Sequence, residues 1–359
     1  MDSELSYEQQ ICLIKLNPMK IFDFSPSLRN DPKVMAIALA GNGLLLEYTN
    51  ESIWSNPEMV AIAANQNGRA LEYAATELCG SKELFMKIKS DTAIKYAKAA
   101  IRNDYDVCYE MAKHNGRAFE HMTPSMRDNY DISLAAVSNY GLALEFASVS
   151  IRNTLAVVEA AVSQDGRALK FASRVIRGNR LIVEKSVSNF GRALEFASPE
   201  FCNTTDVVLK AVKCDGGLEF ASSAMRDDFQ IVKIAVVNNG CSLMFASEKL
   251  RADHRIVSLA VICHGEALEY ASDELKDNDA IVAIAVSNYG EIIRFASPRL
   301  RTNATICYAA LNQTQRSSLY IKDWEPTQPP AKKIMTDEDD PEFDLLAPSI
   351  LGSLRGFFW

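Results

Sequence analysis

Several residue patterns that carry common chemistry are missing from this 359-residue sequence. It has only four histidines, and its eight cysteines include no CxxC pair, which argues against a zinc site and against a dense disulfide framework. It contains no P-loop, no dinucleotide-binding fingerprint and no HExxH motif. We therefore expect no metal site, no cofactor and no catalytic residues.

Long apolar runs and an excess of basic charge are also lacking. No run of about 18 apolar residues occurs, so no membrane span is predicted. The first residues, Met1 to Glu4, are acidic where a signal peptide is basic, which favours a cytoplasmic protein with reduced cysteines. The net charge is −8, whereas binding to a nucleic-acid backbone requires a field of Lys and Arg. We do not expect a nucleic-acid partner.

What the sequence does contain is a repeated motif. The strings GLALEFAS, GRALKFAS and GRALEFAS begin at Gly141, Gly166 and Gly191, and related strings begin at Gly265 and Gly290. The step is 25 residues, with one residue lost in the unit near Gly216. An aromatic residue in the sixth place extends the series to about thirteen units, and the copies at both ends are degenerate, as the caps of a repeat array are.

The pattern within one unit, counted from its glycine as position 1, predicts two helices. Apolar residues at positions 3, 4, 6, 7 and 11, and again at 17, 18, 21 and 22, have helical spacing. Position 14 is Asp, Asn, Ser or Thr, which cap helix N-termini, so a helix of about ten residues is predicted after it. We expect the next glycine to end that helix in the left-handed conformation. The first helix is predicted at about positions 2 to 8, and pairs such as Ser198-Pro199 can start a further turn.

One unit of this length is too short to fold alone, so its apolar faces must be buried against neighbouring units. The sequence therefore predicts an all-α fold, an α-solenoid of about thirteen helix–turn–helix repeats of ~25 residues, over residues 1–321. Packed helices ~9 Å apart would give the array a path of roughly 110 Å. Residues 322–344 are Pro-rich and then acidic and are predicted to be a disordered linker, and residues 345–359 form an apolar C-terminal segment.

The order ALEFAS or ALEYAS, then LR-x-D, then IV-x-x-AV-x-N-x-G resembles a family of tandem helical repeats known only as a domain of unknown function. The resemblance covers about Phe22 to Asn312. Such repeats are seen in intracellular bacteria, protists and large DNA viruses, so the resemblance implies a bacterial protein that acts in a host cell as an effector. It implies no activity and no catalytic residues.

Position 12 is basic in most units, and stacking is expected to align these residues into a ladder. One interpretation is a groove for an anionic partner, and the other is a structural role in which each guanidinium bonds helix-end carbonyls. Glutamates at position 5 occur independently of the basic residues, so a dedicated ion pair is not expected. We interpret the ladder as structural: Arg102, Arg127, Arg152, Arg177, Arg226, Arg251 and Arg301.

Two groups of aromatic residues are candidates for binding a partner. Position 25 is aromatic in Tyr140, Phe190 and Tyr289 but polar in other units, so these side chains either serve a partner or pack locally. Near the end of the sequence lie Phe357, Phe358 and Trp359. The segment 345–359 is interpreted in three ways, as a docking motif, as a cover for the last repeat or as an export signal.

The function that these patterns favour is that of a non-enzymatic protein-binding scaffold, because repeat arrays present extended surfaces to partners. We expect a monomeric chain with a protein partner of unknown identity, located in the cytoplasm or exported into a host cell. Two alternatives stay open. One is an enzyme whose active site is assembled from scattered repeat residues, and the other is nucleic-acid binding through the arginine ladder.

Overall fold

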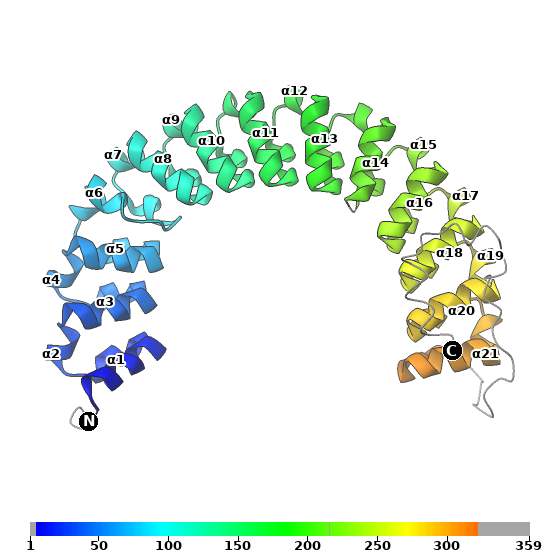
Figure 1. Ribbon diagram of the computed structural model, residues 1–359, viewed down its shortest axis with the longest axis horizontal. Helices are drawn as coiled ribbons and strands as arrows, with labels where there is room; N and C mark the ends of the chain where they lie inside the picture. The colour runs from blue at the N-terminus through cyan, green and yellow to red at the C-terminus, as the bar shows by residue number, and fades with distance from the viewer. Residues whose placement is uncertain (1–4, 215, 322–359) are drawn as a thin grey trace. The chain divides into compact units, whose positions relative to one another are not determined.

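The chain forms an all-α repeat solenoid in the computed structural model, which describes residues 5–214 and 216–321 (Figure 1). It divides into two compact units, Met1–Ser198 and Pro199–Trp359, here called the N-terminal and C-terminal units. The predicted linker 322–344 and the apolar segment 345–359 lie outside the described residues. Within those residues, no helix is both long enough and apolar enough to cross a bilayer.

Each repeat contains three helical segments where the sequence predicted two. In the repeat of Gly141 these are the 3₁₀ helix η7 (Gly141–Phe146), the single turn η8 (Ile151–Asn153) and the α-helix α11 (Leu155–Gln164). The predicted ten-residue helix after position 14 is confirmed in most repeats, but in the repeat of Gly68 it is replaced by the four-residue α6 (Lys82–Phe85). The predicted first helix is wrong in type and extent, because it is a 3₁₀ helix over positions 1 to 6, and the further turn that Ser-Pro pairs indicated is a segment of its own.

The same order recurs along both units. The long helices are α1 (Tyr7–Leu16), α3 (Pro32–Gly41), α5 (Pro57–Gln66), α8 (Tyr105–His114), α10 (Tyr130–Asn139), α11 and α13 (Arg180–Asn189), then α14 (Thr205–Lys213), α16 (Phe229–Asn238), α18 (His254–Cys263), α20 (Asp279–Asn288) and α21 (Ala304–Gln313). The four-residue α-helices are α2 (Pro26–Arg29), α4 (Glu51–Trp54), α6 (Lys82–Phe85), α7 (Ala99–Arg102), α9 (Pro124–Arg127), α12 (Arg174–Arg177), α15 (Ser223–Arg226), α17 (Glu248–Arg251) and α19 (Asp273–Lys276). The remaining 3₁₀ helices are η1 (Pro18–Asp23), η2 (Gly43–Tyr48), η3 (Gly68–Tyr73), η4 (Leu78–Gly80), η5 (Ala93–Tyr96), η6 (Gly116–His121), η9 (Gly166–Phe171), η10 (Gly191–Phe196), η11 (Pro199–Asn203), η12 (Gly217–Phe220), η13 (Gly240–Phe245), η14 (Gly265–Tyr270), η15 (Gly290–Phe295), η16 (Leu300–Thr302) and η17 (Gln315–Leu319).

Within each unit the long helices lie side by side and form one layer, and the short segments follow at their ends (Figure 1). The apolar positions of the pattern face this layer's interior. In α11, for example, Val157, Val158, Ala161 and Val162 have no exposed surface. Most of the aromatic side chains at position 6, such as Phe146, are only half-buried.

Side chains at position 14 begin the long helices as predicted. Asn129 and Asn179 accept hydrogen bonds from the N–H groups of Ile132 and Ile182, which satisfies a free donor of the first turn. Thr154 is an exception, because its hydroxyl donates to Ser150 O (3.0 Å) and makes no cap.

The repeat glycine does not have the predicted left-handed conformation. Among the described residues only Gly216 has a positive φ (85°), and it lies in the repeat that has lost a residue. The repeat glycine begins the 3₁₀ helix and lies against the backbone of the following helix. A β-carbon on Gly43 would be 2.2 Å from Ala63 O, so the close approach of two backbones requires glycine here.

Neighbouring repeats are joined by a regular pair of hydrogen bonds. The N–H group at position 8 donates to the carbonyl at position 12 of the preceding repeat, as in Ser173 N to Arg152 O (2.9 Å) and Ser272 N to Arg251 O (2.9 Å). The hydroxyl at position 8 donates to an Asp or Asn at position 13 of that repeat, as in Ser173 Oγ to Asn153 Oδ1 (2.6 Å). We call the second bond the hydroxyl clip.

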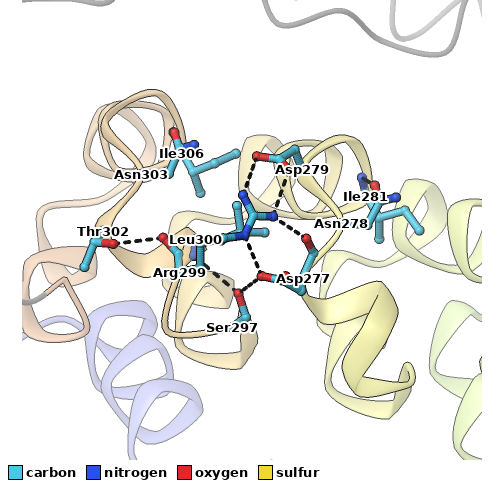
Figure 2. Close-up of polar contacts among 10 residues, drawn as sticks. All are labelled: Asp277, Asn278, Asp279, Ile281, Ser297, Arg299, Leu300, Thr302, Asn303 and Ile306. Atoms are coloured by element: carbon cyan, nitrogen blue, oxygen red, sulfur yellow. Dashed lines mark hydrogen bonds and ion pairs between the residues drawn. The ribbon is translucent and has the colours of Figure 1, made fainter.

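The most elaborate clip joins α19 and η16 (Figure 2). The Ser297 hydroxyl donates to Asp277, and Arg299 adds ion pairs to Asp277 Oδ1 (3.0 Å) and Asp279 Oδ2 (2.9 Å). Both bonds lower the pKa of Asp277, the Ser297 hydroxyl more than the Arg299 charge. This contact shows that position 10 of one repeat lies beside positions 13 and 15 of the repeat before it.

Candidate binding surface

The ladder arginines lie at the junctions between repeats. Their side chains are half-buried, and two of them donate to carbonyls near the ends of 3₁₀ helices. Arg127 Nη1 donates to Phe146 O of the next repeat (3.2 Å), and Arg226 donates to Glu219 O and to Ala221 O. These carbonyls lie at the partially negative end of a helical segment, where a cation is favoured.

Most ladder arginines have a buried Nε group, whereas a phosphate-binding surface needs accessible donors. The Nε atom is buried without a hydrogen-bond partner in these members of the ladder: Arg102, Arg127, Arg152, Arg177, Arg251 and Arg301. A buried donor without a partner costs free energy, and a buried Nε cannot take part in a two-pronged bond to an anion in solvent. Packing of the aliphatic stems between repeats is therefore the main role that this geometry favours.

The position-25 aromatics lie on separate parts of the chain. Tyr140 is half-buried with the Arg117 guanidinium 5.1 Å from its ring centroid. Phe190 is half-buried against the preceding repeat, where a β-carbon on Gly166 would meet its Cβ at 2.8 Å. Tyr289, in the C-terminal unit, is exposed, and a hydrogen bond to Glu291 raises its pKa. Phe357, Phe358 and Trp359 lie outside the described residues.

Cys108 and Cys307 are buried, whereas Cys12 and Cys214 are exposed. Burial raises the pKa of Cys108 to about 12 and that of Cys307 to about 11, so both thiols stay protonated at neutral pH. Cys263 points its thiol at Val237 O, and His264 Nδ1 accepts from Gly240 N–H (3.1 Å). The part of the chain that the structure describes holds no group of three metal-ligating side chains.

A row of exposed apolar side chains on the N-terminal unit is the feature that sequence reasoning missed. It lies where α10, α11 and α13 begin and on the segments between them (Figure 1). We call it the apolar strip, and its members are Tyr130, Val149, Leu155, Val175 and Leu181. The exposed fractions are 73% for Val149 and 75% for Val175 and Leu181, so these side chains contribute little to the core.

The repeat register brings members of the strip together. Leu155 occupies position 15, and Leu181 occupies position 16 of the next repeat. Side chains with this relation are in contact elsewhere in the chain: Arg255 lies 4.5 Å from the Phe229 ring centroid. Val175 occupies position 10 of the repeat that follows Leu155. Arg299 and Asp279 have the same register relation, and they are bonded at 2.9 Å. The register therefore places Leu155, Val175 and Leu181 at neighbouring positions of adjacent repeats.

The corresponding positions of the C-terminal unit have different chemistry. Positions 9, 10, 15 and 16 there hold Pro199, Glu200, Thr205, Asp206, Ser223, Ala224, Phe229, Gln230, Glu248, Lys249, His254, Arg255, Asp273, Glu274, Asp279, Ala280, Pro298, Arg299, Ala304 and Thr305. The one large apolar side chain in this set, Phe229, is half-buried beneath Arg255. The same fold is thus built without exposed apolar residues at these positions, so the strip has no structural explanation.

Polar and aromatic groups border the strip. A surface hollow of about 400 Å³ between α8 and α10 is lined by Tyr109, Lys113, Asp131 and Leu134, among others. Tyr105 stacks on Tyr109, with ring centroids 6.0 Å apart, at the same edge. Arg174 and Arg180, in the repeat of Gly166, are also exposed, and Arg180 forms an ion pair with Glu184 (2.6 Å). A comparison of positions 9, 10, 15 and 16 between repeats would have indicated the strip from sequence alone.

Comparison with known proteins gives one result. Five tandem segments match the profile of a domain of unknown function (DUF4116), at residues 129–177, 179–226, 208–251, 228–276 and 253–301. Four of the segments begin at a position-14 cap and end at a basic residue of position 12, so one family unit spans two structural repeats. No curated protein and no solved structure matches. Residues 129–301 are therefore similar to tandem copies of this repeat family, as the sequence pattern indicated.

Proposed function

We propose that this chain is a non-enzymatic scaffold that binds another protein, and that the apolar strip is its contact surface. The observation that supports this proposal is the exposure of Val149, Val175 and Leu181 at positions where the C-terminal unit is polar. Exposed apolar surface rimmed by polar groups is typical of protein interfaces. The repeats hold the strip on regular helices, so little ordering is required when a partner binds.

The geometry gives less support to the two alternatives, an enzyme with an assembled active site and nucleic-acid binding through the ladder. Among the described residues, each cysteine whose pKa is shifted has it raised by burial, which disfavours a thiolate nucleophile: Cys79, Cys108, Cys202, Cys241, Cys263 and Cys307. Nucleic-acid binding through the ladder is disfavoured because the Nε groups are buried at repeat junctions. The proposal does not include export into a host cell, which stays an expectation drawn from the family resemblance and from residues 345–359, outside the described residues.

The proposal is tested by chemical crosslinking and quantitative affinity capture with the full chain. The strip variant is Val175→Glu with Leu181→Glu, which places two charges on the strip at positions 10 and 16 of one repeat. The matched control is Ala224→Glu with Gln230→Glu, at the same two positions of the C-terminal unit, where both residues are also exposed. We expect a defined set of proteins to be captured by the native chain and by the control variant, and to be lost from the strip variant.

Two outcomes would contradict the proposal. One is capture of the same proteins by all three chains, which would show that binding does not use the strip. The other is equal loss from both variants, which would show that any added acidic charge prevents binding. Thermal unfolding of the three chains checks that the variants are folded.

A further inference from the structure

We propose that a hollow at the first repeat junction of the N-terminal unit binds a small carboxylate with an apolar body. The hollow has a volume of about 290 Å³ and is lined by residues of η1, α2, α3 and α4 and by the end of η2. It shares no residue with the apolar strip, so this ligand is additional to the proposed protein partner and does not depend on it.

The first junction lacks the backbone hydrogen bond that joins the later repeats. Every later junction within the described residues has this bond from position 8 to position 12 of the preceding repeat, as in Ala75 N to Trp54 O (3.0 Å). In the described part of the first junction, the Asn50 N–H group and the Arg29 carbonyl are not bonded to each other. The Asn50 side-chain amide donates to Asn30 Oδ1 instead (3.0 Å). All three residues line the hollow, so the Asn50 N–H group is a donor that a ligand can reach.

Apolar side chains line much of the hollow. Ile21, Met35 and Ile53 are each at most 6% exposed. Phe22 and Tyr48 add two aromatic rings, which meet edge to face with centroids 5.7 Å apart. Tyr48 is 64% exposed, although the aromatic at position 6 is half-buried in most repeats. An apolar ligand body against this ring would cover aromatic surface that the fold leaves in water, which is favourable.

Arg29 is the one charged residue that lines the hollow. Its side chain forms no hydrogen bond or ion pair with the residues that the structure describes, whereas Arg127 at the same repeat position donates to Phe146 O (3.2 Å). The Nε atom of Arg29 is buried, so its two Nη atoms are the donors left for a ligand. A guanidinium forms strong charge-assisted hydrogen bonds with a carboxylate. One positive charge beside apolar walls favours a monocarboxylate over a multiply charged phosphate.

Acidic residues of the same region do not occupy this role. Those nearest to Arg29 in the sequence do not line the hollow: Asp23, Asp31, Glu47 and Glu51. Asp23 pairs with Lys20 (2.8 Å), and Asp31 accepts a hydrogen bond from the Tyr7 hydroxyl (3.1 Å). The two glutamates are exposed to solvent. A carboxylate supplied by a ligand therefore has no described competitor bonded to the guanidinium.

The experiment is an NMR titration of the full chain labelled with ¹³C at its methionine methyl groups. Met35 reports on the hollow, and the Met35→Leu variant assigns its signal. The probe is benzoate, and benzamide is an uncharged control of nearly the same shape. We expect benzoate to shift the Met35 signal in a saturable way, with a Kd at least about tenfold lower than that of benzamide. Met126, in α9, should not shift.

Two variants locate the charge that binds the probe. Arg29→Met keeps the aliphatic stem and removes the guanidinium, so we expect it to weaken benzoate binding at least about tenfold. Arg152→Met is the matched control, because Arg152 occupies the same repeat position at a junction that is closed by the bond from Ser173 N (2.9 Å). It should bind benzoate as the native chain does. Thermal unfolding checks that both variants are folded, and the comparison of benzoate with benzamide needs no variant.

A further titration identifies the source of the carboxylate. N-Acetylphenylalanine resembles the C-terminus of a peptide, and benzoate resembles a free small acid. A Kd for N-acetylphenylalanine at least about tenfold below that of benzoate would indicate a peptide terminus, and a smaller difference a free acid. Either result supports a carboxylate site.

Three results would overturn the inference: no saturable shift of the Met35 signal, equal binding of benzoate and benzamide, or undiminished binding of benzoate by Arg29→Met. None of them bears on the proposed function, because the glutamate variants of the apolar strip test partner capture separately.

Discussion

Gly141 lies so close to Ala161 of the following helix that a β-carbon on the glycine would be 2.5 Å from the Ala161 carbonyl oxygen. The two backbones touch at this point, and the same approach recurs in other repeats, as for Gly240 and Ala260 (2.3 Å). Conformational freedom is not the reason for the glycine, because its φ is not positive. The reason is the absence of a side chain.

The Gly141→Ala substitution should therefore force a shift between the 3₁₀ helix and α11. We expect it to lower the free energy of unfolding by about 2–3 kcal/mol, the cost of overpacking a rigid site. Gly178→Ala is the matched control, since its β-carbon would lie 3.3 Å from Ser198 Oγ and its φ of −92° suits alanine. The control should be neutral or slightly stabilising. Urea unfolding measures the free energy of unfolding of both variants, and equal values for the two would refute the steric explanation.

The ladder arginines should stabilise the fold through their stems. Arg152 has a buried Nε without a hydrogen-bond partner, so Arg152→Ala removes packing, and we expect a loss of about 1 kcal/mol. Arg152→Met keeps the stem and removes the unpaired donor, so it should be about as stable as the native chain.

Arg127 provides the contrast. It donates to Phe146 O, so Arg127→Met leaves a carbonyl without its partner and should destabilise more than Arg152→Met. Thermal unfolding of the native chain and the three variants at one protein concentration is the measurement. If Arg152→Met is as unstable as Arg152→Ala, the guanidinium itself stabilises the junction, and the packing explanation is wrong.

The hydroxyl clip should make stability depend on pH in acid. Hydrogen bonds from Ser148 and Ser150 lower the pKa of Asp128 in the folded chain below its ordinary value of 3.8. A lowered folded pKa means that the stabilisation is complete above the unfolded pKa and is lost as the pH falls through the folded pKa. The contribution of Asp128 should therefore disappear below about pH 4.

The Asp128→Asn substitution tests this sign. An asparagine already occupies position 13 at Asn153, where it accepts from Ser173, so Asp128→Asn should keep the clip and lose its titration. We expect the melting temperature of the native chain to fall more steeply between pH 5 and about 3 than that of Asp128→Asn. Asn153→Asp should show the opposite change, a steeper fall. Parallel curves of melting temperature against pH for all three chains would show that protonation of the clip carboxylate is not coupled to folding.

The sequence predicted the features that local chemistry determines. Asn129 and Asn179 are cap residues in any context, so the starts of α10 and α13 were correct. The 3₁₀ helix was not predictable from spacing, because apolar residues at positions 3, 4 and 7 suit both helix types. The role of the repeat glycine was misassigned because its constraint comes from Ala161, a residue far along the chain, and not from its own backbone angles.

The binding surface was harder to predict than the fold. Tyr140 and Phe190 were singled out because aromatic residues stand out, yet both are half-buried against a neighbouring repeat. Leu155 and Leu181 lie outside the apolar positions of the repeat pattern, and their exposure depends on the direction in which each register position faces. The junction at Ser198 and Pro199 had no signal in composition, since the repeat continues through it.

Leu181 and Val183 lie in the same helix and provide the sharpest test of whether the strip belongs to the fold or to a partner. Leu181 is 75% exposed and Val183 has no exposed surface. Leu181→Gln should change the free energy of unfolding by less than about 0.5 kcal/mol, as exposed substitutions do. Val183→Ala deletes buried methyl groups and should cost about 2 kcal/mol. Urea unfolding of both variants gives the comparison, and Val175→Gln, also 75% exposed, should behave as Leu181→Gln does. A cost at Leu181 equal to that at Val183 would mean that Leu181 is held in the fold. Leu181 would then not belong to the strip, and the proposal that the strip is a binding surface would lose support.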